Sequence, residues 1–379
     1  MSPLLCPRGG AALHPDTPHS LCAANERWPV VDGIPFLRTG REALAAAVLR
    51  HLDAGRREDA LVLLLADQDD WWRGATAEPE ALRALVRGAD TLSLRDAMRH
   101  LSWGPVGDYF AHRWSDPTFL AGLALEEAHW NAPTTAFELA CGIGHHLREL
   151  RRRGAAVSGG DVVFAKLWVA RHWLVPDAAL VCFDAAQPWP VREQRHDLVA
   201  CHDAFYFLEP KTTILRALRE LAGEGGWLAV SHIHNRDWPN LSAGSAVTAG
   251  EIAALFPDGT VYDDAELTRA LVEARTPESA PVATLSGVEA FSVAAGPGLR
   301  PAKPVSGGLA LPPEGAALRR NPLYDADGQI SWPSDRYARE YGPRAPYPPR
   351  ATGPERATSG AATADWARRR ELLDLPERW

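Results

Sequence analysis

Short apolar segments alternate with amphipathic segments from residue 135 onward, and this alternation constrains the fold more than any other feature of the sequence. The apolar segments have the length and composition of buried strands, whereas the segments between them carry apolar residues at helical spacing. Strands that alternate with helices form a parallel sheet with helices on both faces. The expected strands are 136–140, 155–159, 179–183, 196–201 and 226–232, and the expected helices are 145–153, 164–172 and 212–221.

The pattern weakens after these five strands but continues to residue 296. A helix is expected over 264–274, and two weaker strands are expected at 282–285 and 290–295. With the five stronger strands they predict an α/β fold built on a doubly wound, mostly parallel, seven-stranded sheet.

The parts of the chain before and after this region do not show the alternation of strands and helices. Pro and Gly interrupt any regular pattern in the residues before 39. The following region carries apolar residues at helical spacing, as at Leu44, Val48 and Leu52, and is therefore predicted to be helical. This helical region could act as a lid. The C-terminal part is rich in proline, and a disordered tail is one interpretation of it. The alternative is an ordered segment that aromatic residues hold against the domain. A terminal helix is expected over 363–373. The expected domains are 1–38, 39–115, 116–296 and 297–379.

Charge and composition exclude several classes of protein. The formal net charge is −8, from 40 basic and 48 acidic residues, which argues against a large basic face for nucleic acid. No apolar run is longer than that at 60–66, far short of the roughly 20 residues that a membrane span needs, and the first residues lack the apolar stretch of a secretory signal. Five widely spread cysteines do not suggest a disulfide framework. We therefore expect a cytoplasmic protein without a membrane partner.

The most informative motif is Phe-Glu-Leu-Ala-Cys-Gly-Ile-Gly-His-His at 137–146, where a strand, a tight turn and a helix follow one another. Small residues at Ala140, Gly142 and Gly144 allow a ligand to approach the backbone, and the helix start offers free N–H groups. The dinucleotide fingerprint is incomplete because Leu147 stands at its third glycine position. The pattern acid-x-small-x-Gly-x-Gly, with Glu138 as the acid, resembles motif I of the class I S-adenosylmethionine-dependent methyltransferases.

Acids at the ends of the next two strands strengthen the resemblance. Asp161 lies seventeen residues beyond Gly144, and Asp184 ends the third strand beside Ala185. A carboxylate at Asp161 can accept hydrogen bonds from ribose hydroxyls, a feature that NAD-binding folds share; capping of the following helix is the alternative. The fourth strand, His-Asp-Leu-Val-Ala-Cys-His-Asp-Ala-Phe-Tyr-Phe-Leu, resembles motif IV of the same family.

The resemblance covers residues 110–296 and implies the cofactor and its site. The cofactor is S-adenosyl-L-methionine, with Asp184 accepting the adenine amino group and the Ala185 backbone donating to the ring. The residues implied in cofactor binding are Glu138, Ala140, Gly142, Gly144, Asp161, Asp184, Ala185 and His202.

Three histidines follow the fourth and fifth strands and are the candidates for chemistry. Methyl transfer requires a positioned acceptor and sometimes a base that removes its proton. A histidine titrates near neutral pH and can serve as that base, so His202, His232 and His234 are the candidate catalytic residues. The alternative for each is a structural hydrogen bond.

Residues 4–37 resemble the small zinc ribbon that precedes the catalytic domain in some bacterial methyltransferases. Each of the two knuckles, Cys6-Pro-Arg-Gly9 and Cys22-Ala-Ala-Asn25, retains only its first cysteine. Two thiolates alone make a poor structural zinc site, although His14 or His19 could contribute a ligand. We expect no metal here and a small β-element packed on its neighbours.

The leading hypothesis is methyl transfer to a small-molecule acceptor, in specialised metabolism, without a nucleic-acid partner. A catalytically silent methyltransferase-like protein that binds S-adenosylmethionine or a partner is the second, and a nicotinamide-dependent oxidoreductase is the third. The acceptor, the atom that is methylated and the oligomeric state are not determined by the sequence.

Overall fold

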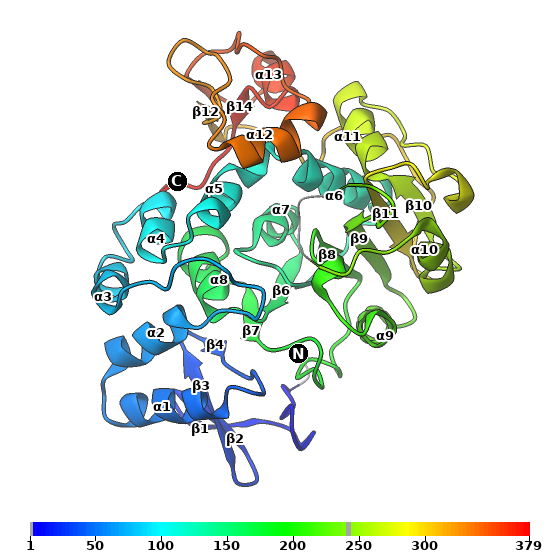
Figure 1. Ribbon diagram of the computed structural model, residues 1–379. Helices are drawn as coiled ribbons and strands as arrows, with labels where there is room; N and C mark the ends of the chain where they lie inside the picture. The colour runs from blue at the N-terminus through cyan, green and yellow to red at the C-terminus, as the bar shows by residue number, and fades with distance from the viewer. Residues whose placement is uncertain (1–2, 240–243) are drawn as a thin grey trace.

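A computed structural model describes residues 3–239 and 244–379 and contains the expected seven-stranded sheet (Figure 1). The strand order across the sheet is β10-β11-β9-β8-β5-β6-β7. The fold is therefore the doubly wound, mostly parallel class I methyltransferase fold that the sequence predicted. The strands are β5 (Thr135–Leu139), β6 (Ala156–Asp161), β7 (Ala179–Cys182), β8 (Leu198–His202), β9 (Trp227–His234), β10 (Thr260–Asp263) and β11 (Ala290–Ala295).

Strand direction places the functional edge. Neighbours from β7 through β9 pair in parallel, whereas β11 runs antiparallel to both β9 and β10. The strand order reverses between β5 and β8, and ligands bind open α/β sheets outside the carboxyl ends of the strands at such a reversal. We call the side where β5 to β9 end the carboxyl edge.

Helices cover both faces of the sheet because successive strand residues point to opposite faces. In β8, Leu198 and Ala200 pack in one apolar cluster, and Val199 and Cys201 pack in the other. The first cluster includes residues of α6 (Pro117–Ala128), α7 (His145–Arg152), α8 (Phe164–Val169) and α11 (Asp264–Glu273), and the second includes residues of α9 (Lys211–Ala222) and α10 (Ala249–Leu255).

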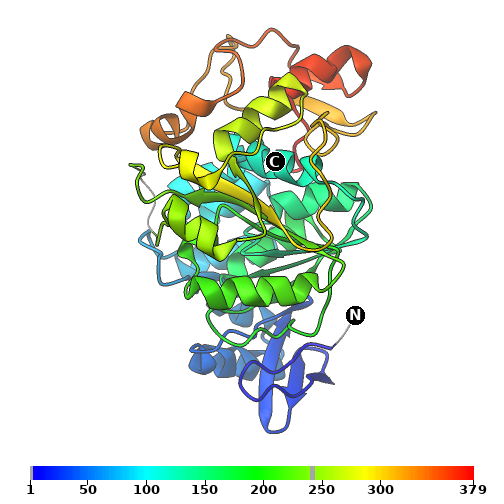
Figure 2. The same cartoon turned by 90° about the vertical axis from the view of Figure 1, so that its right-hand side faces the viewer.

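The N-terminal region forms an antiparallel sheet at one end of the molecule (Figure 2), followed by a set of helices that leads to the sheet domain. Phe36 forms a parallel bridge with Cys182, and the Leu37 N–H donates to the Cys182 carbonyl at 2.7 Å, so this element continues the edge of the main sheet beyond β7. The elements are β1 (His14–Thr17), β2 (Ser20–Ala23), β3 (Glu26–Val31), β4 (Ile34–Pro35), α1 (Glu42–Asp53), α2 (Arg57–Ala66), α3 (Pro79–Arg87), α4 (Leu94–His100) and α5 (Pro105–His112).

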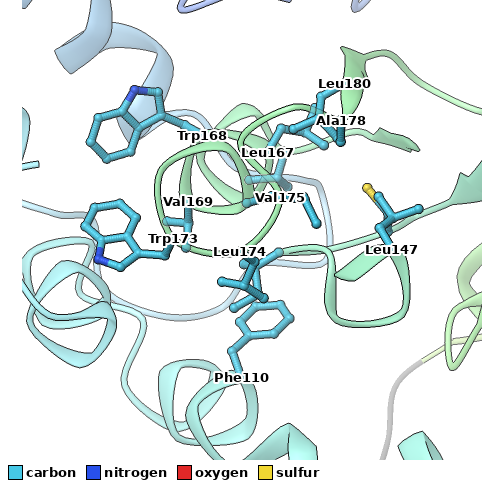
Figure 3. Packing of buried hydrophobic residues seen from close by; sticks show 14 of the residues in the cluster. Phe110, Leu147, Leu167, Trp168, Val169, Trp173, Leu174, Val175, Ala178 and Leu180 are labelled. Carbon is cyan, nitrogen blue, oxygen red and sulfur yellow. The ribbon is translucent and has the colours of Figure 1, made fainter. Parts of the chain in front are cut away.

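The helical region packs on the sheet domain through α8, which continues as a π-helical turn over Ala170–Leu174. Trp168 and Trp173 project from this segment, and the ring of Phe110 on α5 lies beside Leu174 (Figure 3). None of the helices within 3–239 and 244–379 is long and apolar enough to cross a membrane.

The C-terminal extension is ordered and lies at the opposite end of the molecule from the N-terminal sheet (Figure 2). Buried polar groups attach it: Glu127 accepts the Gly307 and Leu309 N–H groups at 2.8 and 2.9 Å, and Arg370 Nε donates to the Trp114 carbonyl at 3.1 Å. Its elements are β12 (Ala317–Arg320), α12 (Asp335–Tyr341), β13 (Arg356–Thr358), α13 (Ala364–Arg368) and β14 (Leu372–Leu373).

Two local expectations were wrong, and one strand was missed. Residues 282–285 are no strand, because Val282–Thr284 forms a 3-10 helix directly after Pro281, with the Pro281 carbonyl accepting the Thr284 N–H. The missing seventh strand is β10, whose four residues give too short a pattern to identify. The expected helix over 363–373 is only α13, because Leu372 and Leu373 pair with β12 instead.

Candidate functional site

The glycine loop between β5 and α7 has the backbone shape that a ligand-binding turn requires. Gly142 and Gly144 adopt φ values of 55° and 86°, in the left-handed region that favours glycine, and α7 begins directly afterwards at His145. Ala140 has a φ of 54° although it carries a side chain. The loop therefore turns sharply at the carboxyl edge and presents the start of α7 to it.

Asp161 lies at the end of β6 and holds this loop in place. Its side chain accepts the Gly142 N–H at 3.0 Å and the Val163 N–H at 2.9 Å, and the Lys166 ammonium lies 3.7 Å away. The residue is only 4% exposed. Asp161 is thus a structural support of the loop as well as the predicted ribose ligand.

Asp184 and Ala185 follow β7 at the same edge. Asp184 is half-buried, and its Oδ1 accepts the Ala186 N–H at 2.9 Å. The Ala185 carbonyl accepts the Trp189 indole N–H at 2.8 Å. Asp184 is more exposed than Asp161 and has fewer hydrogen-bond partners among the described residues.

Glu138 is the one expected cofactor residue with a buried oxygen that has no partner among the described residues. Its Oε2 makes no hydrogen bond, and burial, reinforced by the negative charge of Glu126, raises the pKa of this carboxyl well above its usual range. An uncompensated acid in this position is suited to a nearby positive group.

His202 turns toward α6 and α7. Its Nδ1 lies 2.7 Å from Ser231 Oγ and its Nε2 lies 3.0 Å from Glu126 Oε1, while its ring stacks on His146 at 3.8 Å. Gly122 makes this packing possible, because a Cβ there would lie 2.6 Å from His146 Cε1. Both ring nitrogens of His202 already have partners, and its roles in catalysis and cofactor binding stay predictions.

Asp203, the next residue, is the centre of a buried polar network. Its Oδ2 accepts the Tyr109 hydroxyl at 2.9 Å and lies 3.0 Å from Arg113 Nη1, and its Oδ1 accepts the Tyr206 hydroxyl at 3.0 Å. Burial alone would raise the pKa of Asp203, but Arg113 outweighs this effect together with the neighbouring His232 and lowers it to about 2. Asp203 is therefore ionised and firmly held.

His232 is placed by an irregularity in β9. Its φ of 51° and the register shift opposite Phe291–Val293 mark a bulge, and bulges redirect side chains next to functional sites. His232 Nδ1 lies 2.8 Å from Asp264 Oδ2, and its Nε2 lies 4.0 Å from Asp203 Oδ1. The acid fixes the tautomer, so Nε2 is the basic nitrogen that faces Asp203.

The charges around His232 favour its protonated form. Burial alone would lower its pKa, but Asp264 and then Asp203 outweigh burial, so that the pKa is raised. His234 completes this group: its ring stacks on Tyr206 at 3.9 Å and meets the His232 ring edge-on at 4.9 Å. We call Asp203, His232 and His234 the acceptor edge.

Two groups bring possible metal-ligating atoms within 4.8 Å of one another, Glu126 with His146 and His202, and Asp203 with His232 and His234, but one feature of each group disfavours a metal ion. At the acceptor edge, Arg113 already fills the cationic position beside Asp203. In the other group, the rings of His146 and His202 are only 18° from parallel, so their in-plane lone pairs do not converge on one point. At the N-terminus, Cys6 Sγ donates to Glu26 Oε2 at 2.9 Å, and the expectation of no metal stays a prediction.

Sequence reasoning identified the three histidines but missed the residues that orient them. Asp264 begins α11 directly after the unpredicted strand β10, so no strand pattern drew attention to it. Tyr109 and Arg113 come from α5 and the 3-10 helix Arg113–Ser115, in an aromatic stretch without a recognisable motif.

The described residues fit the cofactor that the resemblance implies. Acidic groups lie at three successive strand ends, and Glu138 offers an unpartnered carboxyl oxygen whose ionised form a nearby ammonium group would stabilise. The loop also has a cover: a Cβ at Gly142 would lie 3.2 Å from the ring of Phe110, so α5 packs over the glycine turn.

Residues 137–230 match the family model described as "Methyltransferase domain". The chain is 28% identical over 172 residues to the ubiquinone biosynthesis O-methyltransferase of Paraburkholderia phytofirmans, covering 42% of this chain and 73% of that protein. The enzyme of the same name from Paraburkholderia xenovorans matches over the same length with the same identity.

Two solved structures resemble the chain more remotely. The plantazolicin methyltransferase BpumL in complex with SAH is 14% identical, covers 57% of this chain and 99% of its own, and gives a TM-score of 0.38. The 1,6-didemethyltoxoflavin-N1-methyltransferase of Burkholderia thailandensis is 18% identical, covers 62% and 93%, and gives 0.32. Likenesses this remote support no argument about function.

Proposed function

Because residues 137–230 form a methyltransferase domain of the class I type, whose methyl donor is S-adenosylmethionine, we propose that the chain methylates a hydroxyl group of a small molecule at the acceptor edge. The observation that carries this proposal is the His232–Asp264 pair. His232 Nδ1 lies 2.8 Å from Asp264 Oδ2, so the other ring nitrogen, Nε2, faces Asp203 at the acceptor edge. A hydroxyl acceptor needs a base, whereas a nucleophile that is already deprotonated does not.

The cofactor residues have distinct proposed roles. Asp161 binds the ribose, Asp184 and the Ala185 N–H bind the adenine, and Glu138 receives the ammonium group of the methionine part. The backbone at Ala140, Gly142 and Gly144 lets the cofactor approach β5. The bound cofactor supplies a methyl group that its sulfonium activates for in-line transfer.

His232 is the proposed base, with Asp264 as its orienting partner. Neutral His232 accepts the proton of the acceptor hydroxyl at Nε2, and the Asp264 carboxylate stabilises the imidazolium that forms. His202 is a weaker candidate because Ser231 and Glu126 occupy both of its nitrogens. His234, stacked on Tyr206, serves as a wall of the acceptor edge rather than as its base.

Two observations support a small acceptor. Tyr341 of the C-terminal extension stacks against Tyr109 at 6.4 Å and Arg344 reaches Asp264, so the extension covers the edge that a large polymer would have to reach. The relatives at 28% identity are named for methylation in ubiquinone biosynthesis, a small-molecule pathway. A role in specialised metabolism stays a hypothesis.

The test has two stages. Calorimetry with S-adenosylmethionine and S-adenosylhomocysteine measures cofactor binding, and transfer of labelled methyl groups to a panel of phenols and alcohols measures turnover. We expect turnover that His232→Gln and Asp264→Asn both abolish, whereas His196→Gln, which changes a buried histidine that contacts Phe137 instead, retains it. Cofactor binding without turnover across a broad panel would favour the catalytically silent alternative.

A further inference from the structure

The C-terminal extension contributes a charged side chain to the His232–Asp264 pair. Arg344, in the 3-10 helix Gly342–Arg344 directly after α12, places Nη1 3.3 Å from Asp264 Oδ2. This is the same oxygen that His232 Nδ1 contacts at 2.8 Å. Arg344 and His232 therefore share one carboxylate oxygen.

The arrangement is buried and leaves Asp264 little freedom. The Asp264 side chain is 2% exposed and that of Arg344 13% exposed. Ser292 Oγ donates to the other oxygen, Asp264 Oδ1, at 2.8 Å. Three donors from three elements thus fix the plane of the carboxylate, since each takes a defined direction around it.

Arg344 is itself held from two sides. Its Nη2 donates to Glu289 Oε1 at 3.1 Å, and its Nε lies 2.9 Å from Glu289 Oε2, an ion-pair contact without the geometry of a hydrogen bond. On the other side, Tyr337 and Tyr341 of α12 are buried and form one aromatic cluster, against which Tyr109 packs. Docking of α12 thus determines where Arg344 lies.

We propose that Arg344 is a positioning residue that sets the basicity of His232 through Asp264. The proposal rests on the proposed function of His232 as the base. Part of the negative charge of Asp264 is neutralised by Arg344, so Asp264 stabilises the imidazolium less than it would alone. The extension consequently keeps His232 from becoming too strong a base to be neutral near physiological pH.

The other charges that face His232 act from separate elements. Asp203, after β8, lies 4.0 Å from Nε2 and favours the imidazolium, whereas Arg113 partly neutralises Asp203. His234 meets the ring edge-on from β9. Arg344 is the cation that contacts Asp264 directly, and its removal changes the field at Nδ1 without altering these other groups.

The test is the titration of His232 by NMR in the full chain, with histidine labelled and the His232 signal assigned by its loss in His232→Gln. Arg344→Met is expected to move the midpoint of His232 to higher pH, and Arg344→Lys to keep it near that of the parent protein. Arg344→Gln removes the charge but keeps a donor for Asp264, so it should also raise the midpoint if Arg344→Met folds poorly. Arg339→Met is the matched control, since Arg339 is an exposed cation on the preceding helix, α12.

An unchanged or lower midpoint in folded Arg344→Met or Arg344→Gln would overturn the proposal, and so would an equal rise in Arg339→Met. The outcome is separable from that of the proposed function. If the midpoint rises but His232→Gln retains methyl transfer, Arg344 sets the basicity of a histidine that is not the base. If the midpoint stays while His232→Gln loses transfer, the base is right and the role of Arg344 is wrong.

Discussion

Replacement of Asp161 by Asn tests whether one carboxylate both supports the glycine loop and binds the cofactor. The side chain accepts two backbone N–H groups, from Gly142 and Val163, one on each oxygen. An Asn amide can serve only one of them and turns its NH₂ toward the other. One charge-assisted hydrogen bond is then lost, and such a bond contributes about 1.5–3 kcal/mol.

The expected loss of stability follows from the loss of this one hydrogen bond. A loss of about 2 kcal/mol in the free energy of unfolding lowers the melting temperature by roughly 4–8 °C in a domain of about 150–250 residues, the size class of the domain expected at 116–296. Affinity for S-adenosylmethionine should fall about ten- to hundredfold, because a neutral amide accepts ribose hydroxyl bonds more weakly than a carboxylate. Thermal unfolding and isothermal calorimetry measure the two effects separately.

Asp184→Asn is the matched control for stability. Asp184 is half-buried and accepts the Ala186 N–H, so its replacement should change the melting temperature little and still weaken cofactor binding. If Asp161→Asn binds the cofactor as tightly as the parent protein, the ribose assignment is refuted. If it also melts at the same temperature, the support of the glycine loop is refuted as well.

Three further predictions concern the acceptor edge and the packing around it. His232→Gln should lower turnover by roughly 10²–10⁴-fold with little change in cofactor affinity. Turnover of the parent protein should rise with pH through an apparent pKa above about 6.5, the usual value for histidine. The reason is that only neutral imidazole accepts a proton and the pKa of His232 is raised. A pH-independent rate would refute the base. Gly122→Ala should destabilise the fold by about 1–3 kcal/mol in chemical denaturation, since the added methyl group would lie 2.6 Å from His146; unchanged stability would show that the stacked histidines can move apart. Glu127→Ala should cost about 3 kcal/mol and expose 305–309 to proteolysis, because Ser306, Gly307 and Leu309 lose their acceptor. Resistance equal to that of the parent would mean that the other contacts of the extension, such as that of Arg370 with the Trp114 carbonyl, suffice to hold it.

The core of the fold could be predicted because its signals are local. Strands β5 to β9 are apolar runs of four to eight residues, and each lies within three residues of its expected bounds. The glycine loop was recognisable because left-handed backbone favours glycine at defined positions. Strand β10 was missed because its four residues, Thr-Val-Tyr-Asp, lie between two helices and depend on β11 for their pairing.

The sequence by itself determined that three histidines and three acids lie at one edge of a parallel sheet, because strand direction and turn chemistry are written within each segment. The tertiary structure alone decided which partners each histidine has, and the proposed choice of base rests on those partners. His202 is paired with Glu126 from α6, whereas His232 is paired with Asp264 from α11 and, through it, with Arg344 from the C-terminal extension. These partners are separated along the chain by 76, 32 and 80 residues, so their contacts depend on how helices pack across the sheet. Proton affinity in a buried site is set by neighbours in space, and spacing along the chain does not reveal them.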